Sequence, residues 1–188
     1  MTAFEHVLLL LSFVYALAIA HCFSCIAALI RASRRVRFSA THALWLANAL
    51  LVIMANWISF WDMRSLASWS PVTILFTFAM ASINYLGVAL TCPEVAPEGA
   101  IDLVQFHIRE SGRYIGAFLA CVLTALAANM VYGGVVAEWN AQNLAVLPML
   151  VLGIAGFLLR KTRWRWIPPA VLLLVWIYYF MVLQAPLR

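Results

Sequence analysis

Six long runs of hydrophobic residues, separated by short polar stretches, make up most of the chain. Each run is close to the roughly 20 residues that an α-helix needs to cross the hydrocarbon core of a bilayer. Charged residues, prolines and glycines bound the runs, which fall at about 4–30, 42–60, 71–92, 114–132, 143–159 and 166–183. The pattern predicts an all-α integral membrane protein, in which residues 1–188 form a single domain of six transmembrane helices.

Residues 101–113, which precede the fourth run, mix polar and apolar positions. Val104, Phe106 and Ile108 alternate as the residues of a β-strand do. An isolated strand at a membrane surface would leave its backbone groups unpaired, however. We therefore expect a short interfacial helix that runs into the fourth span.

The composition agrees with a protein whose main solvent is lipid. Hydrophobic residues make up 66% of the chain, charged residues only 10%, and the mean hydropathy is +0.97. A soluble domain has about 45–50% apolar and about 25% charged residues, and a disordered chain is more polar still, so both classes are excluded. The formal net charge is +5. Because the basic residues cluster beside the apolar runs, we expect contact with lipid headgroups and no nucleic-acid partner.

The basic clusters predict the orientation in the membrane. Ten of the 12 basic residues fall in alternate connections: Arg31, Arg34, Arg35 and Arg37; Arg109 and Arg113; Arg160, Lys161, Arg163 and Arg165. With six spans, these three connections share one side of the bilayer. The positive-inside rule then makes that side cytoplasmic and predicts a multi-pass protein of the plasma (inner) membrane with both termini on the non-cytoplasmic side.

Uncharged polar residues within the runs form the first set of functional candidates. Asn48 and Asn56 lie two turns apart on the second run, and Thr77 and Asn84 lie on one face of the third. Such side chains either line a narrow path for a small polar solute or ion, or tie neighbouring helices together by hydrogen bonds.

Three ionisable residues could complete such a path. His21 lies in the middle of the first run, where an ionisable group is costly and is by default a candidate for function, here as a gate. Asp62 and Arg64 follow the second run and would form the outer mouth. No run carries Asp or Glu at its centre, which disfavours a proton-coupled transporter.

His21 also begins a second hypothesis, a redox or metal site with Cys22 and Cys25. Cys121 on the fourth run could supply another thiolate. The other three histidines lie at depths different from that of His21, which disfavours a bis-histidine haem. No cofactor is predicted, although a metal ion or a haem with one axial ligand stays open.

A ridge of small residues favours close helix packing. Ala16, Ala20, Ser24 and Ala28 recur every four residues on the first run. Such a ridge lets a second helix approach closely, from the same chain or from another copy, so we expect a homo-oligomer.

These features lead to three functional hypotheses. The first is an oligomeric channel or facilitative transporter for a small polar solute or ion. The second is an intramembrane redox or metal-binding subunit, and the third is a non-catalytic scaffold or accessory subunit. Walker, GxSxG and HExxH motifs are absent from the sequence, which disfavours an enzyme.

Overall fold

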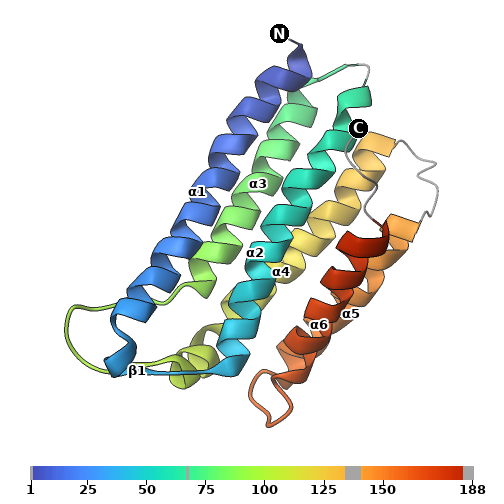
Figure 1. Cartoon of the computed structure of the whole chain (residues 1–188). Coiled ribbons are helices and arrows are strands. Elements are labelled where there is room, and N and C mark those ends of the chain that lie inside the picture. The colour runs from blue at the N-terminus through green and yellow to red at the C-terminus, as the bar shows by residue number, and fades with distance from the viewer. Residues whose placement is uncertain (1, 67, 134–140, 184–188) are drawn as a thin grey trace.

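The computed structural model describes residues 2–66, 68–133 and 141–183, without the side chains of residues 62, 65, 129–133, 141–145 and 182–183. Helices in the described part run alternately in opposite directions (Figure 1). They are α1 (Ala3–Arg31), α2 (Ala40–Ser59), α3 (Pro71–Thr91), α4 (Leu103–Gly133), α5 (Ala141–Leu159) and α6 (Ile167–Tyr178). Short 3₁₀ turns follow α1 and α2 at Ser33–Arg35 and Phe60–Ser65, and a π-helical turn, Tyr179–Leu183, continues α6.

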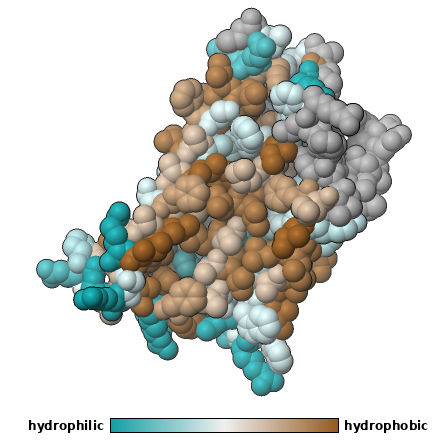
Figure 2. Space-filling view, in the orientation of Figure 1, coloured by the Kyte–Doolittle hydropathy of each residue, from teal (hydrophilic) through white to brown (hydrophobic). Residues whose placement is uncertain are grey.

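The prediction of an all-α fold is confirmed, because an α-helix of the described chain overlaps each predicted run, although α4 begins 11 residues before the fourth run. Four helical segments of the described chain are long and apolar enough to cross a bilayer: Ala3–Arg31, Ala40–Ser59, Pro71–Thr91 and Leu103–Ala128. Val146–Leu159 and Ile167–Met181 are shorter apolar helices. The face shown in Figure 2 carries a hydrophobic band between polar groups at the two ends, as expected of a surface that contacts lipid.

Side chains at the helix starts explain where several helices begin. Thr2 and Glu5 form a capping box on α1, and Ser39 and Ser70 accept hydrogen bonds from backbone N–H groups in the first turns of α2 and α3. Asp102 has the same role for α4, because its Oδ1 accepts from two backbone N–H groups of the first turn, at 2.9 and 3.0 Å. Such caps satisfy backbone donors that have no partner within the helix.

Helix α4 includes most of residues 101–113. The helix expected there is present and runs into the fourth run as expected, as the first part of one continuous helix that begins directly after its cap Asp102. Extended backbone is confined to Ile101–Asp102, which forms the two-residue strand β2. The alternation of apolar residues was therefore a poor guide. The buried positions of this segment follow a helical spacing instead: Leu103, His107, Ser111 and Tyr114.

A short parallel pairing joins two connections at the basic end of the bundle. Strand β1 (Val36–Arg37) pairs with β2. The Arg37 guanidinium lies 3.0 Å from the Asp102 carboxylate, and Arg35 donates to the carbonyl of Gly99 at 3.0 Å and to that of Ala96 at 3.4 Å. We call these contacts the loop clasp. They hold the α1–α2 and α3–α4 connections together, at the end where the α5–α6 connection also lies (Figure 1).

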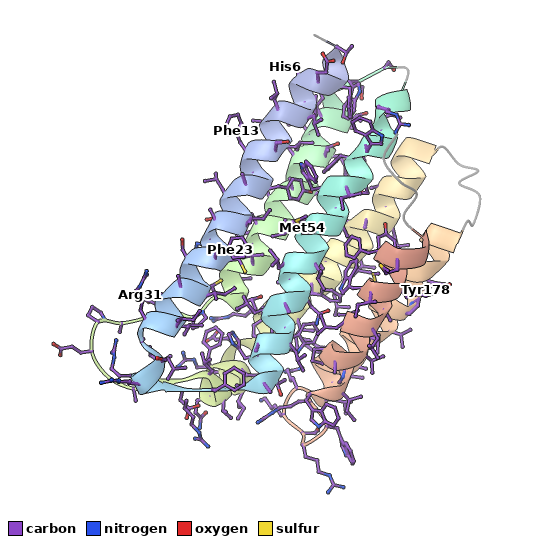
Figure 3. All side chains as sticks on the ribbon, in the orientation of Figure 1. His6, Phe13, Phe23, Arg31, Met54 and Tyr178 are labelled. Carbon is purple, nitrogen blue, oxygen red and sulfur yellow. The ribbon has the colours of Figure 1, made fainter. Side chains whose placement is uncertain are left out.

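Helix α1 extends from one end of the bundle to the other (Figure 3). His6 lies near the end without the loop clasp, whereas Arg31 lies at the basic end. The buried face of α1 comprises Val7, Leu11, Tyr15, Ala18, Cys22 and Cys25. The small-residue ridge is on another face, because Ala16, Ala20 and Ser24 are exposed. Contacts within the described chain therefore do not bury this ridge.

Candidate functional site

A small cavity lies between α2, α3 and α4. Its volume is about 20 Å³, which is room for about one water molecule. The lining residues are Trp45, Ala49, Val52, Asn84, Gly87, Val88, Thr91, Tyr114, Phe118 and Cys121. Aromatic and aliphatic side chains form most of the wall, while Asn84, Thr91 and Tyr114 bring polar groups to it.

Two of the predicted polar residues meet beside this cavity. The Asn56 side-chain amide on α2 donates to Oδ1 of Asn84 on α3 at 3.4 Å and to the carbonyl of Val52 at 2.9 Å. The amide of Asn84 donates to the carbonyl of Met80 at 2.9 Å. Asn84 is buried and lines the cavity. The amide pair thus places a hydrogen-bonding group between α2 and α3 at the cavity wall.

At the basic end of the cavity, a buried histidine bridges α2 and α3. His42 is 1% exposed, and its Nε2 lies 2.9 Å from the carbonyl oxygen of Thr91. Because a carbonyl oxygen only accepts, Nε2 of His42 carries the proton in this contact. The Thr91 hydroxyl donates to the carbonyl of Gly87 at 2.7 Å. The His42 ring also packs edge-on against Phe106 of α4, with ring centroids 5.3 Å apart.

A second buried histidine lies on α4. Nδ1 of His107 is hydrogen-bonded to the hydroxyl of Tyr114, whose side chain lines the cavity. His107 is 0% exposed, and Ser111, one turn along α4, is equally buried. The Tyr114 ring packs near both histidines, with centroid separations of 6.5 Å to His42 and 6.0 Å to His107. Tyr114 therefore connects the two histidines to the cavity.

These polar side chains form what we call the polar seam. From the basic end toward the far end of α2, its members are His107, Tyr114, His42, Thr91, Asn84 and Asn56. Of these six residues, Asn84 and Asn56 are candidates from the sequence, and the other four are not. His42 and His107 each differ in depth from His21, which does not reveal that they lie near each other. Both His42 and His107 lie close to clusters of basic residues in the sequence, and this shared position could have predicted that they lie at the same end of the bundle.

Two other predicted path residues lie away from the cavity. Asn48 donates to the carbonyl of Leu44 at 2.8 Å and to that of Pro169 on α6 at 2.9 Å, so it joins α2 to α6. The Thr77 hydroxyl is buried and donates to the carbonyl of Thr73 at 2.7 Å. Neither side chain is part of the cavity wall.

Two of the three ionisable candidates, His21 and Arg64, also lie apart from the seam. His21 is exposed, and its ring packs against Tyr85 at 6.1 Å. Arg64 is exposed, donates to the carbonyl of Trp61 at 3.1 Å and lies 4.9 Å from the centroid of its ring. The side chain of Asp62 lies outside the described residues.

The candidate metal ligands are distributed over two regions. Cys22 and Cys25 are buried on α1, whereas Cys121 lies on α4 and lines the cavity beside Gly87. His21 is exposed. In the part of the chain that the structure describes, no group of three or more His, Cys, Asp or Glu residues is placed to hold a metal ion. The structure thus does not bring the four candidate ligands together.

The chemistry that the polar seam offers is hydrogen bonding. Its amides, hydroxyls and imidazoles supply both donors and acceptors, and none of its six members is a carboxylate. Such groups can replace the hydrogen bonds that a small polar molecule loses when it leaves water. Comparisons of the chain with known protein families, with curated proteins and with solved structures give no match.

Proposed function

We propose that the chain crosses the bilayer six times, with its basic end in the cytoplasm and both termini on the other side of the plasma (inner) membrane. Helix α5 has 19 residues, a length of about 28 Å at 1.5 Å per residue, close to the roughly 30 Å hydrocarbon core. With its π-helical turn, α6 is nearly as long. The basic residues at one end, in the α1–α2 and α5–α6 connections and in the first part of α4, support the orientation through the positive-inside rule.

We further propose that the protein is a channel or facilitative transporter that carries a small polar solute or ion along the polar seam. The cavity beside Asn84 and Thr91 is the observation that supports this most. Protein interiors are close-packed and contain few empty spaces. A cavity next to hydrogen-bonding groups within a membrane bundle is therefore suited to binding a small polar molecule. The cavity volume favours a solute about the size of water. Passage beyond it requires the surrounding side chains to move.

The exposed ridge of Ala16, Ala20 and Ser24 supports the oligomeric part of the proposal. Small side chains allow the backbone of a second helix to approach closely. A second copy of the chain would cover this face of α1 without disturbing the seam, which lies between α2, α3 and α4.

The experiment is a flux assay on purified protein in liposomes. Stopped-flow light scattering measures the permeation of water and urea, and a trapped pH-sensitive dye measures the permeation of protons. Asn84→Leu keeps a similar side-chain volume but removes the amide from the cavity wall. We expect wild-type protein to raise the permeation of at least one probe above that of empty liposomes, and Asn84→Leu to abolish the increase.

Asn48→Leu is the matched control. It is the same substitution at another buried asparagine, one that faces α6 and not the cavity. It should retain the flux. If wild-type liposomes are no more permeable than empty ones to every probe, the transport proposal is wrong and the scaffold hypothesis gains. If both variants lose flux equally, the seam has no special role.

A further inference from the structure

Positive charge is unevenly distributed over the basic end of the bundle. The α1–α2 connection carries four arginines, which are Arg31, Arg34, Arg35 and Arg37, but the neighbouring α3–α4 connection carries Glu94, Glu98 and Asp102. The α5–α6 connection has Arg160, Lys161, Arg163 and Arg165, and the sequence contains no acidic residue after Glu138. The excess of positive charge therefore lies at the α5–α6 connection.

The ion pairs follow this division in part, since Arg31, Arg34 and Arg35 also form no salt bridge within the described residues. Arg37 pairs with Asp102 at 3.0 Å, and Arg109 and Arg113 both pair with Glu110, at 2.8 and 2.7 Å. Throughout residues 160–166, by contrast, no arginine or lysine forms a salt bridge with a carboxylate of the described chain. Arg160 donates to the carbonyl of Phe157 and lies 4.0 Å from the centroid of the Phe157 ring. Lys161 and Arg163 are exposed and are therefore the cations available to a partner outside the chain.

The same connection carries aromatic side chains suited to the membrane interface. Trp164 and Trp166 are both exposed, and the Arg163 guanidinium lies 4.7 Å from the centroid of the Trp164 ring. Indole rings favour the headgroup region of a bilayer. We call residues 160–166 the cationic loop.

An apolar stripe leads from the cationic loop into the membrane. Val151, Ile154 and Leu158 are exposed on α5, and Leu158 is 70% exposed. Their spacing of three and four residues places them on one face of the helix, whereas Arg160 points toward Gly112 of α4. A molecule that is anionic at one end and hydrocarbon along the rest complements both features.

We propose that the cationic loop binds the headgroup of an anionic phospholipid whose acyl chain lies along Val151, Ile154 and Leu158. The lipid phosphate pairs with the cations of the loop, which have no carboxylate partner in the described chain. Trp164 and Trp166 hold the loop at the depth of the lipid headgroups. Each cation near a membrane surface strengthens the attraction to anionic lipid by about fivefold. This binding is independent of the solute path.

Native mass spectrometry of the purified chain in detergent tests the proposal, with phosphatidylglycerol and phosphatidylcholine of identical acyl chains as probes. We expect phosphatidylglycerol to bind at least tenfold more tightly. The double variant Lys161→Gln, Arg163→Gln should lower its affinity by about tenfold or more and leave phosphatidylcholine unaffected. Arg31→Gln with Arg34→Gln removes two exposed cations from the other connection and should change the affinity less than threefold.

Equal affinity for the two lipids in the wild-type protein overturns the proposal, and this comparison needs no variant. An equal loss in the two double variants also overturns it, because the attraction would then be that of the whole basic end. Inorganic phosphate at 10 mM, a concentration chosen for the assay, should leave phosphatidylglycerol bound. Complete displacement by phosphate would assign the site to a free anion and not to a lipid.

Discussion

The indole ring of Trp45 on α2 fills the space that a side chain would need at position 156 on α5. A Cβ atom on Gly156 would lie only 2.6 Å from Cζ2 of Trp45. The same indole packs against Phe118 and Tyr114, with centroid separations of 5.6 and 6.2 Å, and forms part of the cavity wall. Gly156 thus fixes the position of one wall of the cavity although it does not touch the cavity itself.

Gly156→Ala should destabilise the bundle by overpacking, by about 1–3 kcal/mol, because the rigid indole has to move. Unfolding of the purified variant in mixed micelles measures the effect. Gly116→Ala on α4 is the matched control, since no atom lies within 4 Å of the added Cβ there. It should leave the free energy of unfolding unchanged or raised. Equal stability of the two variants would contradict the packing argument.

Asn48→Leu should affect stability and not transport. The substitution removes the hydrogen bonds from Asn48 to the carbonyl of Leu44 within α2 and to that of Pro169 on α6, and interhelical bonds such as the second contribute about 0.6 kcal/mol on average and up to about 1.7 kcal/mol in membranes. We expect a loss within that range, measured by the same unfolding assay. A larger loss together with abolished flux would mean that Asn48 belongs to the transport path.

The loop clasp should depend on pH through Asp102. The backbone N–H of Gln105 and the Arg37 guanidinium hold the pKa of the Asp102 carboxyl below its usual range. The carboxylate therefore stabilises the fold above its unfolded-state pKa of about 3.9, and that contribution is lost as the pH falls through the lower folded-state value. We expect Asp102→Asn to lower the Tm by a constant amount between about pH 8 and pH 5, and the difference from wild type to vanish in stronger acid.

Asp102→Ala separates the ion pair from the helix cap. Asparagine keeps an Oδ1 atom that can accept from the N–H groups of Val104 and Gln105, whereas alanine keeps neither interaction. The alanine variant should therefore melt below the asparagine variant at neutral pH. If the two variants melt together, the cap adds nothing beyond the charge.

Cysteine labelling tests the proposed orientation. Of the four cysteines, Cys92 at the basic end of α3 is partly exposed, while Cys22, Cys25 and Cys121 are buried. A membrane-impermeant maleimide should therefore label Cys92 in inside-out vesicles and not from outside intact cells, and Cys92→Ser should abolish the label. Labelling from outside would place the basic end on the non-cytoplasmic side.

Helix positions could be predicted from sequence because two physical constraints agree. The bilayer sets the length of each apolar run, and charged or capping residues such as Ser39 and Ser70 set its start. The exact start of α4 was not predictable. It depends on Asp102 acting as a cap and on a pairing with β1, some 65 residues earlier in the chain.

The candidate site was only partly predictable, because its composition depends on the direction in which each side chain faces. Asn48 and Asn56 are eight residues apart, which turns the helix by about 80° beyond two full turns. One amide consequently faces α6 and the other faces α3. His42 and His107 belong to different helices, and only the packing of α2 against α4 around Tyr114 brings them near each other.

The loop clasp has a consequence for how the protein is made. Val36 is the partner of Ile101, and α2 and α3 lie between them in the sequence, so the strands can meet only when these two helices return the chain to the same end of the bundle. During synthesis Arg35 and Arg37 cannot contact their partners Ala96, Gly99 and Asp102 until the α3–α4 connection has left the ribosome. The first three helices are therefore synthesised before the loop clasp can form, and α4, α5 and α6 are synthesised after its residues.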